Sequence, residues 1–306
     1  MTVLHVEKFG SGAPLLLIHG WGMHGGMWGS IVEKLAEEFC VYVVDLPGHG
    51  KSVLPSPFGR GIEGEGADVQ SGSTFTKQSL TPALIEQLAI RLSSQADKSL
   101  VISQGERELD VVVSALTERF PMPLTVCGWS LGGQIALRWA AREPLKIQRL
   151  ILVSSTPCFV KRDDWQCAMA AETLAGFADA LTENYAQTLR RFLALQVRGS
   201  DGERELLVSL RAALFSRGEP DLNALQAGLE ILRDCDCRSS LPTLAQSSLV
   251  IAGERDTLTP PQASQYMAAQ LLNAKLAMIK GAAHAPFLSH PEIFVEQIKS
   301  FLHERI

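Results

Sequence analysis

Residues 124–142, LTVCGWSLGGQIALRWAAR, decide the fold class of this 306-residue chain. The apolar run at 124–127 predicts a buried strand, and the pattern from Gln134 onward predicts a helix with one apolar face. Between them stands the sequence GWSLG at 128–132, a G-x-S-x-G motif that places a serine on a sharp turn from strand to helix. Such a turn exposes the serine Oγ, and the flanking glycines let neighbouring backbone approach closely. We therefore predict that Ser130 is a nucleophile.

Further short apolar runs, bounded by turn residues, recur along the chain at 15–18, 41–44, 150–153, 249–252 and 276–279. Strands that are buried on both faces of a parallel sheet have this continuous apolar pattern, and helical patterns separate the runs. The sequence therefore predicts an α/β protein with a mostly parallel sheet flanked by helices.

A serine hydroxyl is a weak nucleophile at neutral pH, so it needs a histidine base and an acid that orients the base. Asp256 and His284 each follow a predicted strand, and the order Ser, Asp, His fits this arrangement. Glu254 is an alternative acid, although it lies nearer the strand end. His290 is an alternative base, but the following Pro291 indicates the start of a helix. We prefer Asp256 and His284.

Two backbone N–H groups are needed to stabilise the oxyanion that forms during acyl transfer. The N–H of Leu131, directly after the serine, is one candidate, and the N–H of Trp21, after the strand at 15–18, is the other. We assign His19 a structural role.

The sequence Gly50-Lys51-Ser52 looks like the end of a phosphate-binding loop, but Asp45 stands where that loop requires glycine, so the motif does not indicate nucleotide binding.

The chain has two segments that differ from this alternation of strands and helices. Between residues 158 and 240 helical periodicity replaces the strand pattern, which predicts a helical cap inserted between core parts at 1–157 and 241–306. Residues 55–107 begin with a stretch rich in Gly, Ser, Pro and acids, which predicts a surface insertion with one possible helix at 82–92.

Charge and cysteine content exclude several classes of protein. Lys and Arg total 28 against 33 Asp and Glu, a net charge of 28 − 33 = −5, so no overall basic field attracts nucleic acid or an anionic membrane. The six cysteines include no CxxC pair, and we expect neither a metal nor a cofactor. Because no charged leader precedes an apolar segment at the N-terminus, we expect a cytoplasmic protein without a membrane anchor.

The motifs together resemble the α/β-hydrolase superfamily. Several further stretches narrow the resemblance: SSTPCF at 154–159, Asp164-Trp165, FLALQ at 192–196, GLEIL at 228–232 and AAHAPFLSHP at 282–291. With these, the chain is similar to the family of pimeloyl-[acyl-carrier protein] methyl ester esterases, the carboxylesterases of biotin synthesis. The resemblance covers nearly the whole chain except the insertion at 55–107.

The resemblance implies hydrolysis of a methyl ester at the end of a pimeloyl chain carried on acyl carrier protein, with Ser130, Asp256 and His284 as the catalytic residues. It implies that the acyl chain lies under the cap against Trp21, Leu131, Phe177 and Leu181. The spacing of Phe177 and Leu181 also fits plain helix packing.

The resemblance further implies that basic cap residues meet the acidic carrier protein. The candidates are Arg190, Arg191, Arg198, Lys161 and Arg162, although a solvated helix face fits them as well. Two other functions stay open: a broad small-ester esterase or thioesterase, and a non-catalytic ligand-binding protein on the same fold.

Overall fold

In the computed structural model, the chain is described over residues 3–54 and 102–304. The strands are β1 (Val6–Phe9), β2 (Ala13–Ile18), β3 (Phe39–Val44), β4 (Leu124–Trp129), β5 (Ile147–Val153), β6 (Ser247–Gly253) and β7 (Ala274–Ile279). The helices are η1 (Gly25–Trp28), α1 (Ile31–Ala36), α3 (Gln104–Arg119), α4 (Leu131–Arg142), α5 (Ala171–Val197), α6 (Glu203–Ala213), α7 (Leu222–Asp234), η2 (Arg238–Thr243), α8 (Pro261–Gln270), α9 (Pro286–Ser289) and α10 (Pro291–His303).

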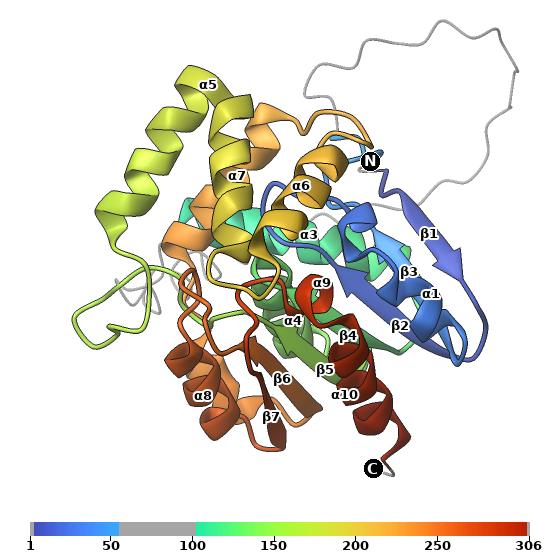
Figure 1. Cartoon of the computed structure of the whole chain (residues 1–306). Coiled ribbons are helices and arrows are strands. Elements are labelled where there is room, and N and C mark those ends of the chain that lie inside the picture. Colours follow the sequence, from blue (N-terminus) through green and yellow to red (C-terminus); the bar gives the residue numbers. More distant parts are fainter. Residues whose placement is uncertain (1–2, 55–101, 305–306) are drawn as a thin grey trace, which may run out of the picture. The chain divides into compact units, whose positions relative to one another are not determined.

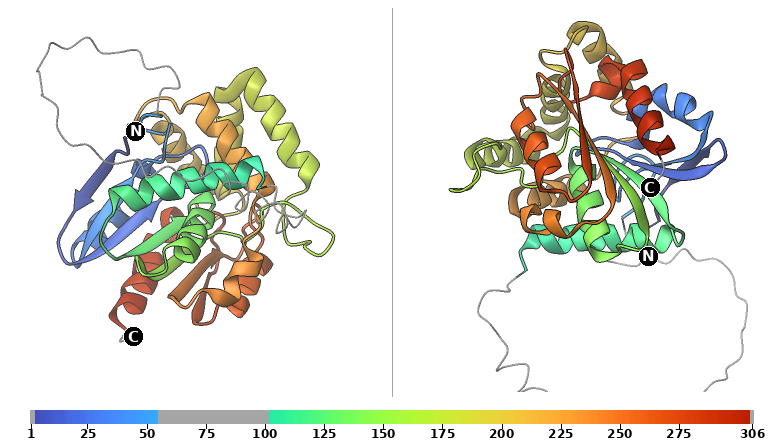
Figure 2. Two further views of the ribbon diagram at one scale, coloured as in Figure 1. Left: turned by 180° about the vertical axis from the view of Figure 1, so that it is seen from behind. Right: turned by 90° about the horizontal axis from the view of Figure 1, so that it is seen from below.

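The strands form one sheet in the order β1-β3-β2-β4-β5-β6-β7 (Figure 1). β1 pairs with β3 antiparallel, and every other neighbouring pair is parallel. Every residue of β4 is buried, as expected for a central strand that helices cover on both faces. Figure 2 shows α1 and α10 on one face of the sheet and α3 and α4 on the other. The predicted α/β class is confirmed.

The sheet differs from the sequence prediction at its two edges. The run at 276–279 was expected to be a central strand, but β7 lies at the edge, where Leu276 and Met278 are more than a third exposed. At the other edge lies β1, which no apolar run indicates, because its sequence VEKF is short and half polar. The antiparallel β1 covers the edge of β3.

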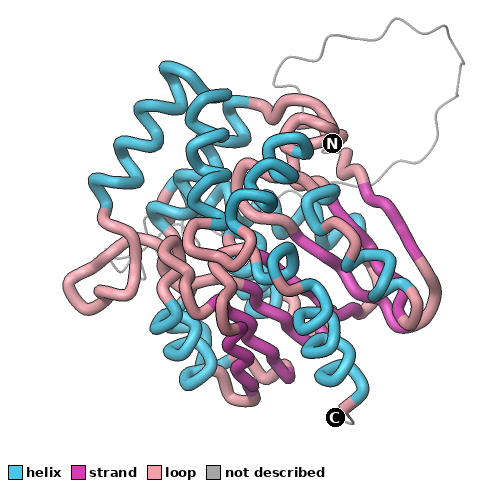
Figure 3. The backbone as a smooth tube through the Cα atoms, viewed as in Figure 1, coloured by secondary structure: helices cyan, strands magenta, loops and turns pink. Residues whose placement is uncertain are grey.

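Between β5 and β6 the chain forms α5, α6 and α7, which Figure 3 shows as a group of helices without strands. We call residues 171–234 the α5–α7 segment. Before β4, α3 begins at Gln104, within the predicted insertion, because Ser103 and Glu106 form a capping box at its N-terminus. The predicted helix at 82–92 lies outside the described residues. In the described part of the chain, no helix is long and apolar enough to cross a bilayer.

Carboxyl ends of parallel strands lie at one edge of the sheet, where ligands bind in open α/β folds. In this sheet the loops that follow β2, β4, β6 and β7 begin at His19, Ser130, Glu254 and Lys280. The fold therefore brings all the predicted catalytic loops to the same edge.

Candidate active site

Ser130 connects β4 to α4 and has φ 55° and ψ −117°, a backbone conformation that residues other than glycine rarely adopt. The surroundings enforce it: Ser130 N–H donates to the carbonyl of Val153 (2.9 Å), and the Ser155 hydroxyl donates to the Ser130 carbonyl (2.8 Å). A Cβ at Gly128 would lie 2.2 Å from the carbonyl oxygen of Gly132, so only glycine permits the turn to be this tight. Strain of this kind is typical of a nucleophile held on a sharp turn.

Asp256 and His284 meet across the loops after β6 and β7. The His284 Nδ1 lies 2.8 Å from Asp256 Oδ2, and both side chains are buried. Asp256 also accepts hydrogen bonds from the Thr259 hydroxyl (2.8 Å) and from the N–H groups of Leu258 and Thr259 (2.9 and 3.0 Å). Since a carboxylate only accepts, His284 carries its proton on Nδ1 and presents Nε2 as an acceptor.

The backbone of His284 is fixed from two sides. The Trp129 indole N–H, from the residue before the serine, donates to the His284 carbonyl (2.9 Å). The His284 N–H donates to the carbonyl of Gln196 at the end of α5 (3.0 Å). His284 Nε2 is buried and has no hydrogen-bond partner within residues 3–54 and 102–304. A buried imidazole nitrogen that is free to accept a proton, on a histidine whose carbonyl is bound by the residue before the strained serine, is what a general base requires.

Two backbone N–H groups flank the serine and are unpaired across the described ranges: those of Trp21 and Leu131. Leu131 is the first residue of α4, so its N–H lies at a helix N-terminus, where negative charge is stabilised. Trp21 lies in the loop after β2, and its indole N–H donates to the Leu225 carbonyl in α7 (2.8 Å). Both N–H groups are available to an oxyanion.

The alternative acid and base lie elsewhere. Glu254 is exposed, whereas Asp256 contacts His284. His290 precedes α10, as its sequence predicts, but its side chain does not cap that helix; its Nδ1 contacts the Ser289 hydroxyl (2.9 Å) instead.

Asp45 organises the glycine-rich turn after β3 by accepting hydrogen bonds from the N–H groups of Gly25 (2.7 Å) and Lys51 (3.0 Å). That turn is a structural one.

A row of aromatic rings leads from the loop after β2 into the α5–α7 segment. Phe192 packs edge-on against Trp21, with 4.9 Å between ring centroids, and Phe177 packs edge-on against Phe192 at 6.0 Å. Leu181 is buried, and Phe177 is half-buried. Phe192 was missed as a candidate substrate contact, although it begins the FLALQ stretch, because periodicity alone does not separate a lining side chain from a packing one.

A cavity of about 780 Å³ lies between α5 and α7. Its apolar lining includes Leu174, Ala178 and Leu229, and its charged lining includes Glu172, Asp179, Glu230 and Arg233. The volume is that of a pocket for a small organic molecule or an acyl chain. No three His, Cys, Asp or Glu side chains in the described part are grouped so that they could hold a metal ion.

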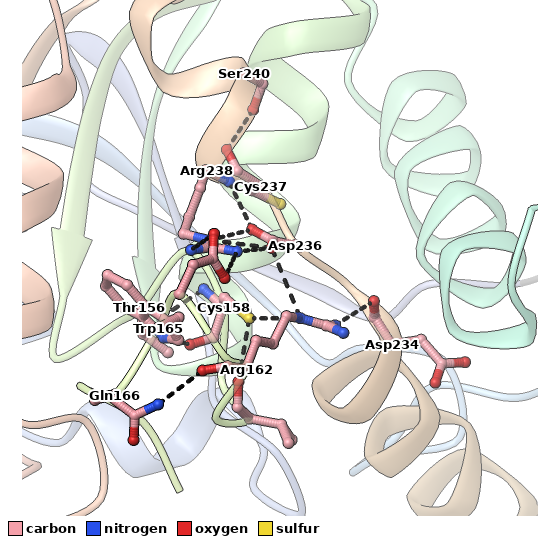
Figure 4. Close-up of polar contacts among 12 residues, drawn as sticks. Thr156, Cys158, Arg162, Trp165, Gln166, Asp234, Asp236, Cys237, Arg238 and Ser240 are labelled. Atoms are coloured by element: carbon pink, nitrogen blue, oxygen red, sulfur yellow. Dashed lines mark hydrogen bonds and ion pairs between the residues drawn. The ribbon is translucent and has the colours of Figure 1, made fainter. Parts of the chain in front are cut away.

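Of the predicted carrier contacts, Arg190, Arg191, Arg198 and Lys161 are exposed, and the Arg190 guanidinium lies 5.9 Å from the centroid of the Phe215 ring. Arg162 has several contacts of its own (Figure 4). Its Nε lies 3.3 Å from Cys158 Sγ, it donates to the Asp234 carbonyl (3.1 Å), and it forms an ion pair with Asp236 (3.7 Å). Cys158 and Asp236 also form a β-bridge. Arg162 therefore connects the chain before α5 to the chain after α7.

The chain matches the family model of the α/β hydrolase fold over residues 13–291. It also resembles the solved structures of an esterase from Exiguobacterium antarcticum (TM-score 0.74, 20% identity, 99% of this chain and 96% of that one) and a bromoperoxidase from Bacillus anthracis (TM-score 0.75, 19%, 99% and 96%). At such identities these two structures support the fold alone. The chain is therefore an α/β hydrolase.

Among curated relatives, the pimeloyl-[acyl-carrier protein] methyl ester esterase of Nitrosospira multiformis is 37% identical over 298 residues, covering 97% of each chain. The enzyme of the same name from Nitrosomonas europaea is 38% identical over 296 residues, covering 96% of this chain and 98% of its own. The chain belongs to this family of esterases, which confirms the family predicted from the sequence motifs.

Proposed function

We propose that the protein hydrolyses the methyl ester of a pimeloyl chain on acyl carrier protein, giving the free pimeloyl carboxylate and methanol. The observation that carries the proposal is the pairing of Asp256 with His284, whose carbonyl is bound by the residue before the strained Ser130, in a chain whose relatives bear that enzyme's name. Every group that ester hydrolysis by a serine requires is present at one edge of the sheet.

In the first half-reaction, His284 Nε2 takes the proton of the Ser130 hydroxyl as Oγ attacks the ester carbonyl. Asp256 holds the imidazole in the required tautomer and stabilises the imidazolium that forms. The N–H groups of Trp21 and Leu131 receive the charge that develops on the carbonyl oxygen. The bond to the methoxy oxygen then breaks, and that oxygen leaves as methanol with the proton from His284.

In the second half-reaction, water replaces methanol. His284 Nε2 takes a proton from the water as its oxygen attacks the acyl-serine carbonyl, and the same two N–H groups hold the oxyanion. Collapse of this intermediate breaks the bond to Ser130 Oγ, which recovers its proton from His284.

We assign residues 158–240 to a cap over a core made of residues 1–157 and 241–306. The ring row of Trp21, Phe192 and Phe177, with Leu181 beside it, supports a route along which the acyl chain reaches Ser130. The cavity between α5 and α7 has none of these residues in its lining, which also carries Glu172, Asp179, Glu230 and Arg233, so the proposed route rests on the ring row.

The exposed bases Arg190, Arg191, Arg198 and Lys161 are the proposed contacts for the acidic carrier protein. Arg162 is a weaker proposal, because its guanidinium is engaged with Asp236 and with the Asp234 carbonyl. Charges at the rim of an interface act mainly on the rate of association and its salt dependence.

The direct test measures methanol release from the pimeloyl-carrier methyl ester and, in parallel, hydrolysis of a short p-nitrophenyl ester. We expect turnover of both, with a far higher kcat/KM for the carrier-bound ester. Turnover of the short ester alone would identify a general small-ester esterase, and the absence of both activities from a folded protein would indicate a ligand-binding protein.

A charge reversal tests the carrier contact. Arg191→Glu should raise the KM for the carrier-bound ester by roughly tenfold at low salt, about 1.4 kcal/mol, and leave the short ester unaffected. Added salt should shrink this difference, since the charges are exposed. Lys8→Glu, a reversal of an exposed base on β1, is the matched control and should change neither substrate. If Arg191→Glu and Lys8→Glu change the KM for the carrier-bound ester equally, Arg191 does not contact the carrier protein specifically.

A further inference from the structure

The His19 ring, directly after β2, bridges two backbone groups that belong to different loops. Leu46 N–H donates to His19 Nε2 (2.9 Å), and His19 Nδ1 lies 2.8 Å from the carbonyl oxygen of Gly20. A backbone N–H can only donate, so Nε2 is the acceptor and carries no proton. A carbonyl oxygen can only accept, so Nδ1 carries the proton and donates it to Gly20.

The surroundings keep the ring in this one form. His19 is fully buried, and burial, together with the nearby His49, lowers its pKa to about 3. The ring is therefore neutral at neutral pH. With both nitrogens in use and no room to turn, the ring holds the Gly20 carbonyl in a fixed direction.

The Gly20 carbonyl shares a peptide group with the N–H of Trp21. In a trans peptide the two point in opposite directions, so fixing the oxygen also fixes the N–H. This peptide lies against the nucleophile: a Cβ built on Gly20 would be only 3.2 Å from Ser130 Cβ. On the far side, the Trp21 indole is tied to the Leu225 carbonyl, so the following residue is also held.

We propose that His19 is a positioning residue of the oxyanion hole, which aims the Trp21 N–H by holding the Gly20 carbonyl through Nδ1–H. The inference rests on the proposed function as far as the use of an oxyanion is concerned, but on no particular ester. It goes beyond a purely structural role for His19, because satisfying the buried Leu46 N–H needs only an acceptor at Nε2. The second hydrogen bond is directed at the peptide that stabilises the transition state.

Two substitutions test the hydrogen bonds of the two ring nitrogens one at a time. The amide nitrogen of His19→Asn replaces Nδ1, so this variant keeps a donor for the Gly20 carbonyl and loses the acceptor for Leu46. The amide of His19→Gln reaches the position of Nε2, so this variant keeps the acceptor for Leu46 and loses the donor for Gly20. Both variants are polar and remove the ring, which makes each the control for the other.

The readout is kcat and KM on a short p-nitrophenyl ester, together with the affinity for an aryl trifluoromethyl ketone, whose adduct with serine carries an oxyanion. We expect His19→Gln to lose about 30- to 100-fold in kcat with an unchanged KM, somewhat less than deletion of an oxyanion donor costs. Its ketone affinity should fall by the same factor. We expect His19→Asn to stay within about fivefold of the parent in both. Equal losses in the two variants, or a loss in KM alone, would overturn the proposal.

The parent protein provides a second test that needs no variant. Nitrogen-15 NMR of the histidine rings distinguishes the two neutral tautomers, and we expect the His19 resonances to show a protonated Nδ1 and a bare Nε2. A protonated Nε2 would overturn the inference even if both variants fail to fold. Because the kinetic test uses a short ester, failure of the parent on the carrier-bound ester would count against the proposed function and leave this inference standing.

Discussion

Ser130 has a strained backbone at the turn from β4 to α4. Its φ of 55° belongs to a region in which a side chain costs about 1–3 kcal/mol, and the hydrogen bonds to the Val153 carbonyl and from the Ser155 hydroxyl hold it there. The same strain that presents Oγ at the edge of the sheet should therefore lower the stability of the whole core.

This leads to a prediction with two variants of Ser130. Ser130→Ala and Ser130→Gly should both lower ester turnover by about 10⁴-fold or more, since each removes the nucleophile. Ser130→Gly should also be about 1 kcal/mol more stable than Ser130→Ala, because glycine adopts this φ without strain. Turnover assays and urea unfolding measure the two effects. Near-parental turnover in either variant would exclude Ser130 as the nucleophile.

The sequence led to Ser130, Asp256 and His284 because each follows an apolar run at the carboxyl end of a strand. It did not lead to Thr259, whose hydroxyl donates to Asp256, or to Phe192, which contacts Trp21. Both depend on contacts between residues far apart or on the exact course of a loop. For His19 the sequence predicted only a structural role, since its two hydrogen bonds appear only in the folded loops.

At the scale of elements, the sequence predicted a helix in the region of α5 from its periodicity. The structure shows that this helix is interrupted. Asn184, with φ −155° and ψ 82°, interrupts the helix, and Figure 1 shows the resulting bend. The Asn184 side chain accepts the Gln187 N–H (3.0 Å), as an N-cap does. The Thr188 hydroxyl donates to the Ala180 carbonyl (2.9 Å). The bend thus begins a second helix, whose residues include Phe192.

We expect Asn184→Ala to lower the free energy of unfolding by about 1 kcal/mol, the usual cost of losing an N-cap acceptor. Asn184→Asp retains an acceptor oxygen and should lose much less. Urea unfolding, compared at constant m-value, measures the difference. Equal stability of the alanine and aspartate variants would show that the cap does not hold the bend.

A local sequence pattern marks the start of α3 but not the strand β1. The start of α3 is encoded in the sequence Ser103-Gln104-Gly105-Glu106, a capping box that marks a helix inside the predicted insertion. By contrast, β1 has no local signal. Its pairing with β3 exists only once the sheet has formed, so single-sequence periodicity misses it.

At the scale of the molecule, the α5–α7 segment contacts the loops that form the candidate active site. Three backbone carbonyls of the segment accept hydrogen bonds from the catalytic loops: Leu225 from Trp21, Ala213 from His24 and Gln196 from His284. Arg217, between α6 and α7, also pairs with the buried Asp45 (3.4 Å). The segment therefore helps to fix the geometry of these loops, and it also carries Phe192 and Phe177 of the proposed route to Ser130.

Several histidines of these loops are buried, with consequences for stability. Burial lowers the pKa values of His19, His24 and His49. In the unfolded chain such side chains gain a proton near pH 6.5, whereas in the folded state they do so only at lower pH. The unfolded state thus binds more protons as the pH falls below 6.5, so the stability present above that pH is lost progressively on acidification.

His49, whose ring lies 5.4 Å from the ring of His19, allows this linkage to be tested by a stability measurement. Its Nδ1 donates to the Pro47 carbonyl (2.9 Å), and its buried Nε2 has no partner in the part of the chain that the structure describes. His49→Asn keeps the donor and removes the titrating ring. Between pH 6.5 and 5, we expect the variant to lose less stability than the parent, by up to about 1.4 kcal/mol per pH unit. Urea unfolding across this range measures both curves. Parallel curves would mean that His49 is protonated equally in the folded and unfolded states, contrary to its burial.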